Sequence, residues 1–486
     1  MKNIDIFFKK KMFGMFCLGF SSGLPILLVF STLSVWLVKA GINRSTVTLF
    51  SWAGFAYAFK YLWSPLVDNY KLPIFKKLGH RRSWLFLTQI FIIFALVLTS
   101  FTDPQKNLFY TAFFITLLAF FSSTQDIIID AFRIESAPQS LQGPLSSMYI
   151  SGYRVAMLVA GAGSLWLAAF FGAEIYNQIV WKKVYLIMAI LMIIGIIATI
   201  TSDEPRLKKK IKSENHLNFL ITIIISLIGF LYLYSLLENP FSRDELFLSF
   251  IFSILRLLVC FVFSFLIIKI LILNKFISKE KINKSYLSPI NNFLIRYGKF
   301  AFLILLLISL YRIADVVMGV MANIFYLEKG YKIIEIATYS KFFGVFATII
   351  GGLIGGFCAY KFGTMKSLFF GALIAAASNF LFAILAISPI SINFLIAVIT
   401  ADNISSGFAG AAFVIYLSGL TSIKFTATQY ALFSSIMLFL PKLIAGYAGS
   451  WVDIMGYPYF FSFTAFLGVP VLFLILWISK VAPIRN

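Results

Sequence analysis

The sequence has little charge and few of the residues that build catalytic or metal sites. Only 12% of its 486 residues are charged, and it contains 2 histidines and 3 cysteines. All of the cysteines, Cys17, Cys260 and Cys358, lie inside apolar runs, so we expect neither a disulfide framework nor a metal cluster. Both histidines, His80 and His216, lie in basic loops, which argues against a histidine proton relay within the apolar segments. No cofactor is expected.

Motifs for energy transduction and catalysis are also missing. The Gly-x-x-x-x-Gly-Lys-Ser/Thr phosphate loop does not occur, so the sequence shows no ATP-binding motif of this kind that could drive transport. Two loop histidines and three cysteines in apolar runs cannot assemble a Ser/His/Asp or metal-ligand constellation. The sequence therefore argues against an enzyme.

Apolar residues dominate instead and make up 60% of the chain, which places it outside the range of soluble globular proteins. A membrane-spanning helix needs about 20 apolar residues, and runs of that kind occur at about 14 places. We therefore predict an all-α multi-pass membrane protein. The predicted spans are 13–38, 47–67, 84–101, 108–132, 146–171, 184–201, 217–238, 246–273, 299–326, 334–360, 366–387, 391–421, 428–449 and 458–480.

The net charge of +22 lies mainly in the short connections between these spans. Basic clusters follow alternate spans, as the positive-inside rule requires of cytoplasmic loops, so both termini are predicted to be cytoplasmic. The chain has no folded module outside the membrane that is large enough to bind nucleic acid, so we expect no nucleic-acid partner. The basic start is followed by an apolar run too long for a cleaved signal, which we interpret as the first span.

A weak internal repeat divides the predicted spans. Each half has a short basic turn after its second span, and the fourth span of each half carries an acid, Asp126 or Asp402. This predicts a six-helix half at 1–201, basic loops with two extra helices at 202–298, and a second six-helix half at 299–486. Two six-helix halves with an inserted pair resemble the arrangement of major facilitator transporters.

Charged side chains within apolar spans are costly, at roughly 2.5 to 3.5 kcal/mol each, so they mark either a substrate pathway or a paired structural lock. Asp126, Asp130 and Arg133 share one face of the span at 108–132. For Asp130 and Arg133 we favour a structural lock, in which they pair with the basic turn at Arg81 and Arg82. Asp126, beside Gln125, fits either role. The predicted cytoplasmic gate is Asp68, Arg81, Arg82, Asp130 and Arg133.

Further charges lie near the middle of other predicted spans. Arg312 and Asp315 are three residues apart and fit either an internal pair or a proton switch, since an arriving anion at the arginine would release the acid. Lys60 and Lys341 are predicted to lie nearer a surface, and Trp36 and Trp52 are candidates for stacking on a sugar. The predicted substrate-binding residues are Gln125, Arg154, Arg312, Lys442, Tyr153 and Gln429, and the predicted proton-coupling residues are Asp126, Asp315 and Asp402.

Several distinctive motifs occur along the chain: FSSGLP at 20–25, KYLWSPLVD at 60–68, GHRRSW at 79–84, STQD at 123–126, DAFRIE at 130–135, GYR at 152–154, YRIAD at 311–315 and FTATQYAL at 425–432. In these motifs the chain resembles one family, the AmpG muropeptide permeases. The resemblance implies proton-driven import of anhydro-muropeptides across the bacterial inner membrane. The sequence departs from the family pattern at Asp402, where a glutamate is expected.

Three hypotheses remain open from the sequence. The favoured one is a proton-coupled importer of a sugar-peptide, acting as a monomer in the lipid bilayer. The second is a transporter of another anionic metabolite, such as an acyl-coenzyme A or a nucleotide-like compound. The third is a membrane assembly factor on the same fold that transports nothing, and the cost of burying the span acids argues against it.

Overall fold

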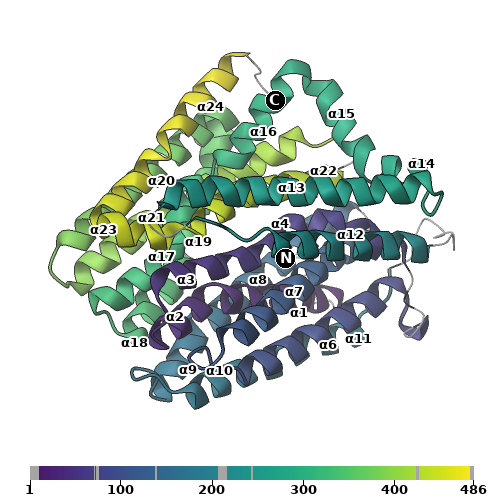
Figure 1. Ribbon diagram of the computed structural model, residues 1–486. Helices are drawn as coiled ribbons and strands as arrows, with labels where there is room; N and C mark the ends of the chain where they lie inside the picture. The colour runs from purple at the N-terminus through teal and green to yellow at the C-terminus, as the bar shows by residue number, and fades with distance from the viewer. Residues whose placement is uncertain are drawn as a thin grey trace. The chain divides into compact units, whose positions relative to one another are not determined.

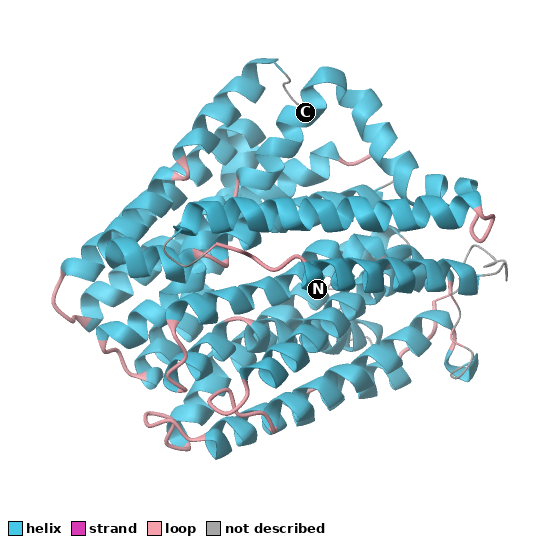
Figure 2. Cartoon of the chain, viewed as in Figure 1, coloured by secondary structure: helices cyan, strands magenta, loops and turns pink. Residues whose placement is uncertain are grey.

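The computed structural model describes residues 10–70, 72, 76–136, 139–205, 216–241, 245–422 and 426–481. These described residues form helices joined by short loops, with no strand among them (Figure 2). The predicted all-α fold is therefore confirmed. Figure 1 labels most of the helices.

The α-helices follow one another along the chain with short connections. Up to residue 201 they are α1 (Lys10–Val29), α2 (Ser31–Lys39), α3 (Arg44–Leu49), α4 (Phe55–Phe59), α5 (Ser64–Asn69), α6 (His80–Ser100), α7 (Leu108–Ser136), α8 (Gln139–Leu158), α9 (Ser164–Phe170), α10 (Gln178–Leu191) and α11 (Ile193–Thr201). The middle of the chain forms α12 (His216–Leu236), α13 (Leu246–Leu273), α14 (Lys279–Ile282) and α15 (Ser288–Tyr297). The remaining helices are α16 (Ala301–Leu310), α17 (Ile313–Lys329), α18 (Ile333–Glu335), α19 (Gly344–Phe362), α20 (Thr364–Ile387), α21 (Ile392–Leu420), α22 (Thr426–Ala445), α23 (Ala448–Phe466) and α24 (Val469–Val481).

Tighter and wider turns interrupt several helices. The 3₁₀ segments are η1 (Phe50–Gly54), η2 (Lys60–Leu62), η3 (Lys76–Leu78) and η7 (Gly298–Phe300). The π-helical segments are η4 (Val159–Gly163), η6 (Asn283–Leu287) and η8 (Ile336–Phe343).

The membrane-spanning character of the chain is evident from the length of its apolar helices. In the described part of the chain, 11 helical segments are long and apolar enough to cross a bilayer. Two shorter apolar helices, Ile221–Leu236 and Gln429–Ala445, add to them, and the predicted span at 47–67 is broken into short helical pieces. The chain is a multi-pass membrane protein, and the count of about 14 spans stays a prediction.

The described residues group into two compact units. Unit 1 takes those of 1–60, 72–207 and 299–486, and unit 2 takes those of 61–71 and 208–298. Unit 1 thus contains described residues of both predicted halves except 61–71, and the predicted division at 201 and 298 stays a prediction. In unit 2, α12 and α13 lie side by side (Figure 1), and Arg256 of α13 donates to the carbonyl oxygen of Tyr234 on α12.

Glycines allow close helix packing in both halves of unit 1. A side chain at Gly19 or Gly23 of α1 would collide with the backbone of Tyr149 or Tyr153 on α8. In the second half, α19 approaches α21 in the same way, because Gly351 lies against the backbone of Ile404. Small residues bring helices together in lipid, where no hydrophobic force acts between them. The repeat predicted from the sequence thus has a counterpart in how each half is packed.

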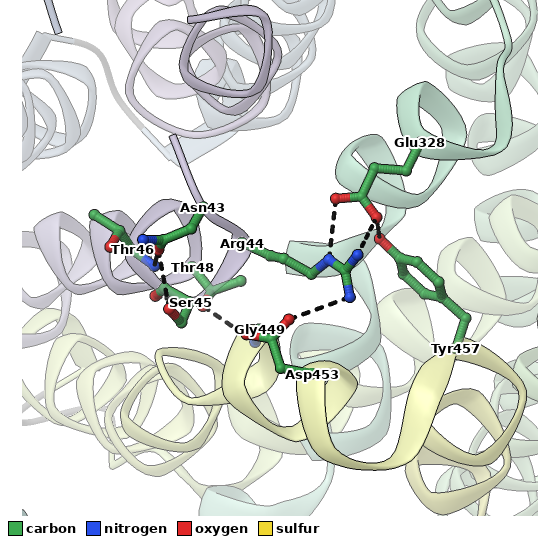
Figure 3. A network of polar contacts seen from close by, with 9 residues as sticks. All are labelled: Asn43, Arg44, Ser45, Thr46, Thr48, Glu328, Gly449, Asp453 and Tyr457. Atoms are coloured by element: carbon green, nitrogen blue, oxygen red, sulfur yellow. Dashed lines mark hydrogen bonds and ion pairs between the residues drawn. The ribbon is translucent and has the colours of Figure 1, made fainter. Parts of the chain in front are cut away.

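We call the end of unit 1 where α1 begins the proximal end, and the end where α2 finishes the distal end. At the distal end, Arg44 of the first half lies between acids of the second half (Figure 3). Its guanidinium is 3.0 Å from Glu328 and 3.2 Å from Asp453, and the Tyr457 hydroxyl donates to Glu328 at 2.7 Å. We call this cluster of Arg44, Glu328, Asp453 and Tyr457 the distal latch. It joins α3 to α17 and α23.

Candidate transport site

A cavity of about 250 Å³ lies between the two halves of unit 1. The first half lines it with the end of α1, with α2 and with α3–η1, and the second half lines it with α17, η8 and α22. Three charged residues line it, Asp315, Lys341 and Lys442, all from the second half. Among the residues predicted from the sequence, the structure therefore places Asp315 and Lys442 in one cavity.

Asp315 belongs to the first turn of α17, where a carboxylate favours the positive end of the helix dipole. Its carboxylate is 3.0 Å from the guanidinium of Arg312, which is the N-cap residue of the same helix. Arg312 also donates to the Ser406 hydroxyl of α21 at 3.1 Å. The pairing allowed by their spacing is present, and it leaves the Asp315 side chain 11% exposed.

Asp402 of α21 belongs to the same group of charges. It interacts electrostatically with Asp315, Arg312 and Lys341. Neither Arg312 nor Asp402 is among the described residues that line the cavity. The acid that lines the cavity is thus Asp315, and Asp402 interacts with it electrostatically.

Lys341 lies in the cavity wall although the sequence predicts a position nearer a surface. It is carried by η8, and η8 packs against η4 of the first half. Gly161 of η4 lies against Lys341, since a Cβ there would lie 3.6 Å from the Cβ of Lys341, in ordinary van der Waals contact. π-Helical turns often occur at functional sites because they displace side chains from the regular helical register.

Lys442 of α22 faces the first half. Its ammonium group lies 4.0 Å from the centre of the Phe30 ring, a cation–π contact across the boundary between the halves. Within the described part of the chain, neither Lys442 nor Lys341 has a carboxylate within 4.0 Å. The cavity therefore contains two lysines without an ion-pair partner.

Uncharged polar groups complete the lining. Asn323 of α17 donates to the hydroxyls of Ser31 at 3.2 Å and Ser34 at 3.0 Å, so it bonds across the two halves. The Asn323 Oδ1 atom and the Ser51 hydroxyl are buried and have no hydrogen-bond partner among the described residues. Buried polar atoms are normally bonded, so these two are available to a ligand.

A second polar cluster surrounds Asp126 in the first half and does not line this cavity. Ser22 donates to Asp126 at 2.5 Å and contacts the Tyr149 hydroxyl at 3.0 Å. The neighbouring Gln125 is fully buried and accepts from Ser21 at 3.2 Å. These contacts tie α7 to α1 and α8.

Four residues of the predicted cytoplasmic gate, Arg81, Arg82, Asp130 and Arg133, lie at the proximal end of unit 1. Arg81 is 6% exposed and forms a 2.7 Å ion pair with Glu135, an acid that was not predicted from the sequence. Asp130 lies 3.5 Å from Arg133 within α7, so these two pair with one another. The side chain of Asp68 lies outside the described residues.

Glu204 is a second acid at this end that was not predicted from the sequence. It follows α11 and accepts from the backbone N–H groups of Arg81 at 2.8 Å and Arg82 at 3.0 Å. The side chain of Arg82 donates to the carbonyl oxygen of Thr199 at 2.8 Å. Its carboxylate lies at the first turn of α6, where an anion favours the helix dipole, but that turn contains no acid of its own that could have signalled the contact in the sequence.

Other predicted residues have packing roles. Gln429 is fully buried and accepts from the backbone of Ser422 at 2.7 Å. Trp36 is fully buried against Trp181, whereas the half-buried Trp52 donates to the backbone of Leu443 and has ring contacts with Phe55 and Tyr447. Their aromatic surface is used between helices.

Arg154 and Tyr153 lie on α8, away from the lining of the cavity. Arg154 contacts the Met157 sulfur at 3.7 Å, and Tyr153 lies 6.1 Å from Tyr149 between ring centres. The predicted substrate-binding set is therefore not gathered in one place. The structure brings together Arg312, Asp315 and Lys442, with Asp402 beside them.

An all-helical membrane protein with two packed halves and a charged cavity between them is a membrane transporter by class. The sequence model of the Major Facilitator Superfamily matches residues 11–327. The chain belongs to this superfamily and, within it, to the AmpG family of transporters.

Two relatives illustrate the family match. A putative transporter AmpG 4 of Rickettsia felis is 33% identical to this chain, covering 98% of each. The anhydromuropeptide permease of Escherichia coli strain K12 is 29% identical, covering 94% of this chain and 78% of its own length. Both matches span the two halves.

Solved structures agree on the fold. A POT family transporter in complex with a thioalcohol-conjugated peptide superposes with a TM-score of 0.66 at 15% identity, covering 96% of this chain and 95% of that one. The xylose transporter XylE of Escherichia coli, in a partially occluded inward-open conformation, gives 0.57 at 12% identity, covering 98% of each. At such identities the likeness shows the fold alone.

Proposed function

We propose that this protein imports anhydro-muropeptides across the bacterial inner membrane in symport with protons. Both termini would then be cytoplasmic and the working unit a monomer. The cargo is suggested by the name of the Escherichia coli relative. The observation that carries the proposal is the cavity between the halves, which holds a carboxylate, Asp315, beside two lysines without ion-pair partners.

Proton coupling follows from the arrangement of charges. The Arg312 guanidinium compensates the charge of the Asp315 carboxylate 3.0 Å away. An anionic cargo that draws Arg312 toward itself removes this compensation, and a proton that enters with the cargo replaces it at Asp315. Asp402 adds a second negative charge nearby and strengthens this effect. Binding of cargo and binding of a proton thereby favour one another.

The energetics support symport of an anion. An inside-negative potential opposes the entry of each negative charge by about 2.3 kcal/mol per 100 mV. A proton that enters with the cargo removes one unit of this opposition. Each pH unit of the gradient adds about 1.36 kcal/mol of driving force. A muropeptide with free carboxylates needs such assistance.

The cavity is small for this cargo. Its volume lies below the range of roughly 300 to 1,000 Å³ that is usual for sites of drug-sized ligands. A sugar-peptide of several units needs more room, so the two halves must separate around it. Residues at the boundary of the halves are therefore expected to change contacts during transport.

Counterflow of labelled anhydro-muropeptide in proteoliposomes tests the proposal. Wild-type protein should exchange the label, and an imposed pH gradient should drive accumulation. Asp315→Asn and Asp402→Asn should each remove the pH-driven accumulation, because neither amide can carry a proton. Asp103→Asn is the matched control, since Asp103 lies in a loop and binds the hydroxyl of Tyr176. Full proton coupling in both cavity variants would contradict the proposed mechanism.

A second candidate cargo is another anionic metabolite, such as an acyl-coenzyme A or a nucleotide-like compound. It is favoured by the same two lysines, which attract any anion. Competition distinguishes the two: anhydro-muropeptide should block uptake of its own label, whereas phosphate-rich compounds should not. If phosphate-rich compounds blocked uptake and anhydro-muropeptide did not, the second candidate would be the cargo.

A further inference from the structure

We propose that Lys442 and Lys341 form a carboxylate-binding subsite that accepts a single anionic group of the cargo. This inference rests on the proposed transport function and specifies how the cargo is recognised. It adds Lys341 to the site and gives Lys442 a defined partner in the ligand.

The charges around the cavity leave a positive surplus. Arg312 and Asp315 neutralise one another at 3.0 Å, and Asp402 acts electrostatically on Lys341. The positive charge of Lys442 is left without a compensating acid among the described residues, and its ammonium group makes a cation–π contact with the Phe30 ring at 4.0 Å. An uncompensated ammonium group at such a depth is costly, and a bound anion would relieve that cost. The balance corresponds to one negative charge on the ligand.

The uncharged polar groups of the cavity narrow the class of ligand that fits the subsite. Asn323 Oδ1 can only accept hydrogen bonds. It has no donor among the described residues, although Asn323 is buried, with only 4% of its surface exposed. The Ser51 hydroxyl is likewise unpartnered, in a residue that is 5% exposed. A ligand that satisfies both presents a carboxylate close to an N–H or O–H group. N-acylated amino acids and hydroxy acids have this pattern.

Both halves contribute to the subsite. Phe30 and Ser51 come from the first half, and Lys341, Lys442 and Asn323 come from the second. Because Asn323 also donates to Ser31 and Ser34 across the boundary, a ligand on its Oδ1 joins an existing bridge between the halves. The volume of about 250 Å³ holds one unit of the cargo, not the whole molecule.

Direct binding measurements on the full chain in nanodiscs test the subsite. The probes are anhydro-muropeptide and the same compound with its carboxylates converted to amides. Wild-type protein should bind the carboxylate form about tenfold more tightly or better, the value of one charge-assisted hydrogen bond. In Lys442→Gln the two forms should bind about equally, and Lys341→Gln should lose part of the preference. A full preference in both variants would overturn the proposal.

Matched variants separate recognition from folding. Lys442→Arg keeps the charge and should retain the preference, whereas Lys106→Gln removes an exposed loop lysine and should behave as wild type. Melting temperatures of all variants show whether each is folded. If Lys442→Arg lost the preference as fully as Lys442→Gln while remaining folded, the charge would not be the cause and the subsite would be wrong.

A panel of smaller probes distinguishes this proposal from the choice of cargo. N-acetyl-amino acids, lactate, inorganic phosphate and the corresponding amides are measured on wild type and Lys442→Gln. If carboxylates bind in a Lys442-dependent way and anhydro-muropeptide does not bind, the subsite is supported and anhydro-muropeptide is not the cargo. Anhydro-muropeptide bound equally with and without its carboxylates refutes the subsite and supports the cargo. Tighter binding of phosphate than of any carboxylate, or no anion binding at all, also overturns the subsite.

Discussion

At the scale of single residues, the site depends on the absence of a side chain as much as on the presence of charges. Gly54 of η1 faces Phe30 and Lys442, and a Cβ at this position would lie 3.0 Å from Phe30 Cζ and 3.2 Å from Lys442 Cε. Such distances are shorter than ordinary van der Waals contact. The cation–π contact that orients Lys442 therefore requires a glycine on the opposite half.

Gly54→Ala should weaken binding of the cargo while leaving the fold intact. The added methyl group displaces Lys442 or Phe30, but alanine favours helical backbone by about 1 kcal/mol, which offsets much of the strain. We expect a several-fold higher KM for uptake and a change of less than about 1 kcal/mol in the free energy of unfolding. Gly356→Ala is the control, because a Cβ there meets nothing within 4 Å. An unchanged KM in Gly54→Ala would argue against the role of the contact.

At the scale of helices, the distal latch shows how a kink can place polar groups. Gly456 interrupts α23 with a φ of 75°, a backbone conformation that favours glycine, and Pro458 follows it. Asp453 and Tyr457 lie on either side of this kink, and both reach the Arg44–Glu328 pair (Figure 3). Three helices that are distant in sequence are thereby joined at the distal end.

Arg44→Gln should favour opening of the distal end. Each of its partly exposed ion pairs is worth about 0.2 to 1 kcal/mol, so their loss shifts the equilibrium between closed and open forms several-fold. The accessibility of Ser34→Cys to a membrane-impermeant thiol reagent measures this shift, since Ser34 lines the cavity. Lys39→Gln is the control: it removes an ion pair with Glu174 at the same end but within one half. Equal labelling rates in both variants would exclude a latch.

At the scale of the whole molecule, transport requires that the two halves of unit 1 change their contacts. Asn323 bridges them through Ser31 and Ser34. Gly446 and Gly449 bring α22 and α23 against Trp52 and the backbone of Arg44. Close packing of this kind has discrete arrangements and does not deform continuously, so the halves are expected to move as bodies.

A thiol cross-link between Ser31→Cys and Asn323→Cys should therefore stop transport. The three native cysteines are first replaced, and a short reducible cross-linker then joins the two halves. Uptake should fall to background and return on reduction. As a control, Thr32→Cys with Ser164→Cys joins two hydroxyl positions 2.9 Å apart within the first half and should leave uptake unaffected. Transport that persists through the first cross-link would show that this contact stays closed during the cycle.

The sequence by itself determined the features that depend on local patterns. Apolar runs of spanning length identified a membrane protein, and the three-residue spacing of Arg312 and Asp315 allowed the pair that the structure contains. The motifs between residues 20 and 432 identified the family. These features follow from the periodicity of one helix or from the order of residues along the chain.

Tertiary structure alone decided which charged residues meet. Lys341 lines the cavity from η8, which packs against η4 of the other half, whereas Gln429 binds the backbone of Ser422. Glu135 is the acid that pairs with Arg81, and it lies five residues beyond Asp130 on α7. The physical reason is that the depth and orientation of a side chain depend on contacts with segments outside its own helix. The spacing within a single helix does not contain that information.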